Sequence, residues 1–177
     1  MKSSNQIIEQ ILILRCQIGD KEALAELIDR YQAPLLYFIS RLSANPEMAE
    51  DIFQETWLTI IKHICSLKKP DAFSIWLYRI ARNKIYQQLR RKKALSKLNE
   101  NIIAANNTKE DTFSAEDAVK IHQCLKELQA EHREVLILRF LEQMSYKQIS
   151  EVTNCSLGTV KSRLYYAKLA LRKDMEK

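Results

Sequence analysis

The chain has 177 residues, of which 46% are hydrophobic and 28% charged, and it contains only two glycines and three prolines. This composition favours a folded protein made mostly of helices over a disordered or β-rich one. The four cysteines form no C-x-x-C pair, and no stretch reaches the roughly 18 to 20 apolar residues that span a bilayer. We therefore expect a cytoplasmic protein with no disulfide framework, no metal site, no cofactor and no membrane insertion.

The net charge of +6 conceals an alternation along the chain. Residues 1–60 carry five basic and nine acidic residues, whereas residues 61–93 carry ten basic residues and one acidic residue. Residues 94–130 are again acidic on balance, and residues 131–177 are again basic. Such blocks suit a polyanion that is held at two places, together with a separate basic partner.

The first expected helices lie in the acidic block. Apolar residues at spacings of one, three and four predict a helix over residues 20–42, which Pro34 is expected to kink or split. Asn45 as N-cap and Pro46 at the first helical position then predict a helix over roughly residues 46–65. Upstream, residues 1–19 contain apolar positions that indicate either an additional packing helix or a contact for a regulator.

A third long helix is expected in the first basic block. Asp71 is expected to cap it, and the basic cluster Arg90–Lys93 to end it. Three amphipathic helices suffice for one small bundle. Residues 94–116 then lose the periodicity and gather Asn, Ser, Thr and acids, which predicts a linker.

The last part of the chain predicts a second helical unit. Apolar positions between residues 119 and 141 indicate two helices, and S-Y-K-Q at residues 145–148 fits a capping box that opens a third. After the turn T-N-C-S at residues 153–156, a basic helix follows. The sequence thus predicts an all-α protein with two small helical domains, a three-to-four-helix bundle over residues 1–93 and a four-helix domain over residues 117–177.

The end of the second unit has the pattern of a helix-turn-helix. Asn154 lies where the turn needs a left-handed backbone, which Asn tolerates. Gly158 lies in the first turn of the closing helix, where a missing side chain lets the backbone approach a phosphate or a neighbouring helix. The alternative is a basic helix whose charges are simply solvated. The residues expected to read duplex DNA are Ser156, Gly158, Thr159, Lys161, Ser162 and Arg163.

The outward face of the third expected helix carries aromatic, basic and amide side chains together. Rings stack on unpaired bases at about 1 to 3 kcal/mol each while cations hold the backbone, so this mixture is typical of a surface for melted nucleic acid. The alternative is that Tyr78 and Tyr86 only pack into the bundle. The residues of this face are Tyr78, Arg79, Arg82, Asn83, Tyr86, Gln87 and Arg90.

The second expected helix carries the opposite charge. Its acids indicate a docking surface for a basic protein partner. The alternatives are a solvated helix face and a divalent-metal site of a nucleic-acid-processing enzyme, although no histidine or phosphate-binding loop accompanies the acids. The residues concerned are Glu47, Glu50, Asp51, Gln54 and Glu55.

Three segments together resemble the extracytoplasmic-function (ECF) sigma factors of bacterial RNA polymerase, a group of the sigma-70 family. "AEDIFQETWLTIIK" resembles region 2.2, and "AFSIWLYRIARNKIYQQLRRKK" resembles regions 2.3 and 2.4. "MSYKQISEVTNCSLGTVKSRLYYAKLALRK" resembles region 4.2. The resemblance covers about residues 20–93 and 117–173. It implies a factor that binds core RNA polymerase, directs it to promoters and captures melted minus-10 DNA without catalysing a reaction.

The resemblance also assigns roles to residues. It implies that Glu50, Asp51, Gln54 and Glu55 meet core polymerase, and that residues 66–71 form a loop that captures a flipped minus-10 base. The minus-10 set is Lys68, Lys69, Tyr78, Arg79, Arg82, Asn83, Tyr86, Arg90 and Arg91. The minus-35 set is Ser156, Gly158, Thr159, Lys161, Ser162, Arg163 and Tyr166. An anti-sigma factor is expected as a further partner.

The chain departs from the family at several positions, which bear on promoter preference. Members often carry Asp, a small residue, Gly and Arg where this chain has Gln87, Ser150, Asn154 and Tyr166. A helix-turn-helix activator or repressor that binds DNA without polymerase is a second hypothesis. A single compact unit with the tyrosine-arginine face sealed inside would contradict the sigma-factor interpretation.

Overall fold

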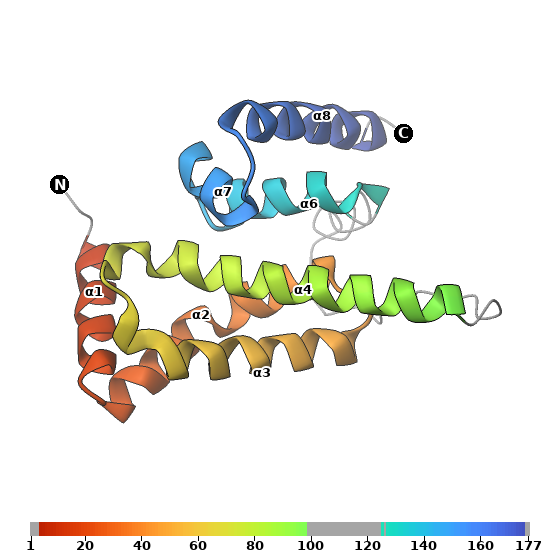
Figure 1. The fold of residues 1–177 in the computed structure, drawn as a ribbon. Coiled ribbons are helices and arrows are strands. Elements are labelled where there is room, and N and C mark those ends of the chain that lie inside the picture. The colour runs from red at the N-terminus through yellow and green to blue at the C-terminus, as the bar shows by residue number, and fades with distance from the viewer. Residues whose placement is uncertain (1–3, 99–124, 126, 176–177) are drawn as a thin grey trace.

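The computed structural model describes residues 4–98, 125 and 127–175. Every element in these residues is a helix or a helical turn, which confirms the all-α class. Figure 1 shows a lower group of four helices, α1 to α4, and an upper group formed by α6, α7 and α8. None of the described helices combines the length and the apolar composition that a bilayer span requires.

The N-terminal residues form a packing helix, α1 (Ser4–Gln17), which was one of the two expectations for this segment. Its inner side is buried through Leu12, Ile13 and Cys16. The backbone turns at Gly19, whose φ of 87° favours glycine, and the backbone N–H of the next residue reaches back to the carbonyl of Arg15.

Helix α2 (Lys21–Leu42) begins at the N-cap Asp20, whose carboxylate accepts hydrogen bonds from two backbone N–H groups of the first turn. Pro34 lies inside this helix without dividing it. Of the two outcomes expected for Pro34, a kink or a split, the split into two helices is excluded. The buried side of α2 runs along its whole length, and its packing offsets the hydrogen bond that proline cannot donate.

Helix α3 (Pro46–His63) starts as the sequence predicts. The Asn45 side chain accepts a hydrogen bond from the backbone N–H of Met48 at 2.9 Å, and Pro46 occupies the first helical position. The buried face of α3 packs against α2 and α4, so its acids are left on the outside.

Two 3₁₀ turns, η1 (Ile64–Ser66) and η2 (Pro70–Ala72), lead from α3 to α4 (Phe73–Leu98). Asp71 lies within η2, the 3₁₀ turn that immediately precedes α4. Helix α4 also continues five residues beyond Lys93, into the segment predicted to be linker. The added residues, Ala94–Leu98, include good helix formers, and nothing in them stops a helix.

Aromatic side chains hold the core of the lower group together. The rings of Phe38 and Tyr78 meet edge to face at 5.2 Å between centroids, and those of Tyr31 and Phe73 at 5.4 Å. The fully buried residues around them include Leu27, Leu35, Ile39, Ile52, Ile60, Leu77 and Ile85.

The upper group comprises α6 (Ala130–Leu136), the π-helical turn η3 (Ile137–Leu141), α7 (Tyr146–Thr153) and α8 (Leu157–Met175). The helix expected between residues 119 and 128 falls mostly outside the described residues. The core of this group contains Val135, Leu138, Ile149, Val152, Val160, Leu164 and Ala167.

The two groups pack directly on one another, α7 against α4 and α6 against α2. The sequence indicates two separate modules. Because they pack on each other, residues of α4 that are expected to face DNA can instead face the upper group.

Candidate nucleic-acid interface

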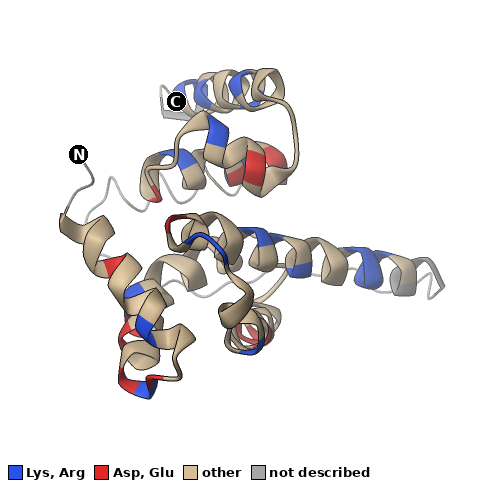
Figure 2. Ribbon diagram, turned by 60° about the vertical axis from the view of Figure 1, so that its left-hand side comes forward, with Lys and Arg blue, Asp and Glu red and all other residues tan. Residues whose placement is uncertain are grey.

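The loop before α4 and the far end of α4 present the expected cations to solvent. Lys68, Lys69, Arg90 and Arg91 are all exposed, and so is Asn83 in the middle of the helix. Figure 2 shows basic residues recurring along α4. This part of the minus-10 set lies where the sequence predicts it.

Tyr78 does not lie on that surface. Its side chain is 0% exposed and packs against Phe38, so the expectation that its ring faces solvent is wrong, and the alternative that it pads the bundle holds. Helix α4 is covered by α2, α3 and α7 on different sides, which makes its buried stripe wider than one seam. Burial raises the pKa of the Tyr78 hydroxyl, beside which lies the Glu142 carboxyl of the upper group.

Arg82 and Tyr86 are half-buried and face the upper group instead of solvent. The Nε of Arg82 donates a hydrogen bond to Glu134 Oε1 at 2.7 Å, and the Tyr86 hydroxyl lies 3.5 Å from Glu134 Oε2. Glu134 is 0% exposed, and burial raises the pKa of its carboxyl, while the charge of Arg82 acts in the opposite direction. Burial also raises the pKa of Tyr86 to about 12.

Sequence reasoning missed Glu134. A signal for it exists, because Glu134 immediately precedes the apolar run Val135–Leu138 and lies one helical turn from a buried leucine, in register with the core. A charged residue in such a register requires a partner, which here comes from the other half of the chain.

A cleft of about 560 Å³ remains between α4 and the helix-turn-helix. Arg79, exposed at its rim, donates from Nε to the backbone carbonyl of Glu151 at 2.9 Å. The described residues that line the cleft are Arg79, Asn83, Ser150, Glu151, Asn154, Cys155 and Ser156. The upper group therefore covers α4 only in part.

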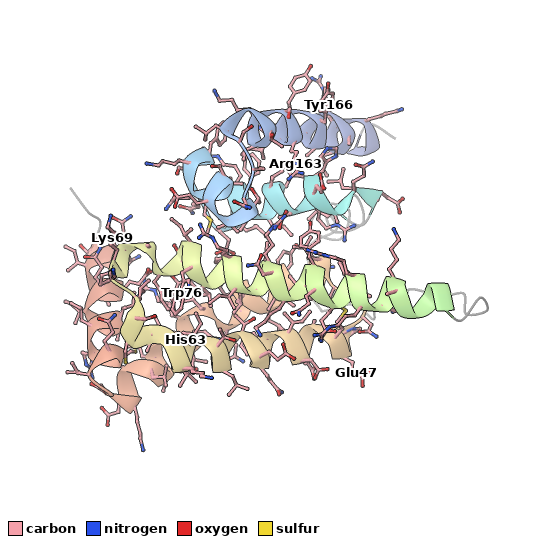
Figure 3. All side chains as sticks on the ribbon, in the orientation of Figure 1. Glu47, His63, Lys69, Trp76, Arg163 and Tyr166 are labelled. Carbon is pink, nitrogen blue, oxygen red and sulfur yellow. The ribbon has the colours of Figure 1, made fainter. Side chains whose placement is uncertain are left out.

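The acidic side of α3 is open. Glu50, Asp51 and Gln54 are exposed. Glu55 forms an ion pair with Lys84 of α4, with 3.2 Å between Lys84 Nζ and Glu55 Oε2. Leu58, one turn further, is 66% exposed and was not expected at this surface. Figure 3 places Glu47 and Lys69 at opposite ends of the α3–α4 pair. Across the part of the chain that is described, no group of three or more His, Cys, Asp or Glu is placed to hold a metal ion.

The helix-turn-helix has the predicted local chemistry. Ser145 and Gln148 form a reciprocal capping box at the start of α7, and Asn154 adopts a left-handed conformation with φ of 52°. Ser156 caps α8, since its Oγ accepts a hydrogen bond from the backbone N–H of Thr159 at 3.1 Å. The buried residues of α8 leave the expected reading face outside.

Most of the minus-35 set lies on that outer side. Ser156, Gly158, Lys161, Ser162 and Tyr166 are exposed, and Thr159 is half-exposed. Figure 3 shows Tyr166 on the outer side of α8.

Arg163 is the exception in this set. It is directed toward α6, where it forms an ion pair with Glu131 inside the upper group. Its place on α8 is half-buried because it flanks the apolar seam at Val160 and Leu164. The expectation that Arg163 is free for DNA is wrong in this arrangement.

Gly158 is not required by the local packing. Among the described residues, a Cβ there would meet the Ser156 Oγ, at an ordinary distance of 3.6 Å, and no neighbouring helix. Of the two reasons that the sequence suggests for this glycine, a close helix neighbour is excluded, and approach to a phosphate stays a prediction.

Comparisons with known proteins identify the chain. The family model described as Sigma-70 region 2 matches residues 27–95, and the one described as Sigma-70, region 4 matches residues 118–171. The ECF RNA polymerase sigma factor SigW of Bacillus subtilis is 32% identical over 170 residues, which cover 89% of this chain and 91% of that protein. The chain belongs to the ECF sigma factors of the sigma-70 family. The RNA polymerase sigma-H factor of Pseudomonas aeruginosa is 30% identical, with 95% and 94% of the two chains covered.

Solved structures share the fold of this sigma factor. The sigma factor RpoE, in a co-crystal with the anti-sigma factor NepR from Bartonella quintana, matches with a TM-score of 0.77 and 24% identity. That match covers 86% of this chain and 96% of the other. CnrH, in complex with the cytosolic domain of CnrY, matches with a TM-score of 0.69 and 21% identity over 96% and 97% of the chains.

Family membership sets the function at a general level. As an alternative sigma factor, the chain directs RNA polymerase to promoters, and its family consists of transcription regulators rather than catalysts. The interpretations as a DNA-binding activator or as a metal-dependent enzyme receive no support from these matches.

Proposed function

We propose that this sigma factor holds core RNA polymerase through the exposed side of α3. Glu50, Asp51 and Gln54 project from a rigid helix whose opposite side is core, so their positions are fixed before any partner arrives. Complementary charge accelerates association and excludes wrong partners. The exposed Leu58 beside them adds apolar area that a partner would bury. This open acidic side is the observation that carries the proposal.

The basic loop and the outward part of α4 bind the melted minus-10 strand. Exposed cations lie at both ends of this surface, where they can bind the phosphates of a single strand. They are Lys68 and Lys69 before the helix and Arg90 and Arg91 along it. Arg79, Arg82, Asn83 and Tyr86 complete the surface once the upper group moves away, whereas Tyr78 supports it from the core.

The upper group reads the minus-35 duplex with the start of α8. A recognition helix enters the major groove by its N-terminal residues, and here these are Ser156, Gly158 and Thr159, followed by Lys161 and Ser162. The capped, outward N-terminus of α8 supports this role. Tyr166 lies one turn beyond, on the same outer side.

The chain acts in the cytoplasm, where its polymerase works, and catalyses no reaction itself. We expect an anti-sigma factor to regulate it, because the related structures contain the complexes of RpoE with NepR and of CnrH with the cytosolic domain of CnrY. The domain limits are residues 1–93 and 117–177, joined by residues 94–116, with α4 extending into the linker.

A core-polymerase pull-down coupled to run-off transcription on genomic fragments tests the proposal. Wild-type chain should be retained by core polymerase and should produce discrete transcripts, and Asp51→Lys should lose both. Glu26→Lys, which makes the same charge change at an exposed site of α2, is the matched control and should behave as wild type. Unchanged retention of Asp51→Lys would contradict the assignment of α3.

A further inference from the structure

The contact between α4 and α6 places a buried acid on the predicted minus-10 surface. Arg82 and Tyr86 both meet the Glu134 carboxylate, at 2.7 and 3.5 Å. The Arg82 guanidinium also lies over the Tyr86 ring, 4.5 Å from its centroid. A single carboxylate from the upper group therefore engages two residues of the minus-10 set at once.

The carboxylate makes the kind of contact that a nucleic-acid backbone would make. A guanidinium binds carboxylates and phosphates through the same array of N–H donors. An aromatic ring beside a guanidinium is also a platform for an unpaired base. With Glu134 hydrogen-bonded to Arg82 Nε, a phosphate has no access to that donor.

We propose that Glu134 is an internal competitor of promoter DNA, which occupies the Arg82–Tyr86 site in the closed arrangement and leaves it when the upper group moves away. The inference rests on the proposed function of α4. In the closed arrangement the chain displays its polymerase-binding side and withholds part of its DNA-binding side. A partner that separates the two groups, such as core polymerase, releases the DNA-binding side.

The closed arrangement is suited to reversible opening. Burial of an ion pair returns little net stability, because desolvation of the two charges offsets their attraction. Arg79 adds a hydrogen bond to the carbonyl of Glu151 at an exposed position. Opening rehydrates the Glu134 carboxylate, which offsets part of the cost of breaking its contacts with Arg82 and Tyr86.

Removal of the Glu134 charge tests the competition directly. The isolated full chain is titrated against a fluorescent single-stranded DNA of mixed sequence, and binding is followed by anisotropy. Glu134→Gln keeps the side-chain shape and is expected to bind about tenfold more tightly than wild type, a typical size for coupling between two states. Glu131→Gln is the matched control, since it removes the same charge from an exposed position of α6 whose ion pair, with Arg163, lies within the upper group. It should leave the affinity unchanged.

Cysteine alkylation measures opening independently of DNA. Cys155 is half-buried and lines the cleft between α4 and the helix-turn-helix, whereas Cys65 is exposed in η1 and serves as the internal reference. Glu134→Gln should increase the alkylation rate of Cys155 relative to Cys65, with the helical circular dichroism spectrum retained. Unchanged DNA affinity would overturn the proposal, whether or not Cys155 becomes more reactive.

A third variant separates this inference from the proposed function. Arg90 and Arg91 are exposed and do not contact Glu134, so the double change to Ala should weaken DNA binding in wild type and in Glu134→Gln alike. If the double change has no effect on either chain, the role of α4 in DNA binding fails. If the double change weakens binding but Glu134→Gln does not strengthen it, only the internal competition fails.

Discussion

The outer sides of α3 and α4 differ in how much of each is available in the closed arrangement. The acidic side of α3 is open from Glu50 to Leu58, whereas the middle of α4 is covered at Arg82 and Tyr86. The two helices are neighbours in one bundle, so the difference comes from the upper group, which packs through α7 on α4. A chain of this shape is able to meet polymerase first and melted DNA second.

Tyr78→Ala should have the largest effect and tests whether the middle of α4 is structural. Removal of a fully buried ring costs about 3 to 5 kcal/mol of unfolding free energy, because a cavity remains next to Phe38. Urea denaturation followed by circular dichroism measures the loss. A stable Tyr78→Ala chain with weakened DNA binding would instead restore Tyr78 to the DNA surface.

Leu58→Glu tests the open side of α3. The side chain is 66% exposed, so we expect the unfolding free energy to change by no more than about 0.5 kcal/mol. Affinity for core polymerase should fall about tenfold, since a buried apolar contact would be replaced by a desolvated charge. Surface-immobilised core polymerase measures this. Unaltered affinity would show that the contact ends before Leu58.

Ser145→Ala tests the cover that α7 places on α4. The change removes the capping box with Gln148 and should cost about 1 kcal/mol, fraying the first turn of α7. Hydrogen exchange should accelerate in α7 and in the part of α4 beneath it. Exchange confined to α7 would mean that the cover does not depend on this helix end.

Features that depend on neighbouring residues were predictable from the sequence. The Asn45 cap, the box of Ser145 with Gln148, and the left-handed Asn154 each need only residues within about four positions, and the structure has all of them. The same holds for the outward acids of α3, since a helical period of 3.6 residues separates them from the apolar stripe. An error arose where the cue was weak, at the end of α4, which continues to Leu98.

The sequence by itself determined the helices, their caps, the division of charge and the motifs of a sigma factor, because each of these features depends on residues that are close together in the chain. Only the tertiary structure decided that Tyr78 is core and that Arg82 faces Glu134. Arg82 and Glu134 are 52 residues apart in the chain, and no local pattern reports which surface of one helix a distant helix will cover. The packing of two apolar units against each other settles that question, and it places an acid where DNA is proposed to bind.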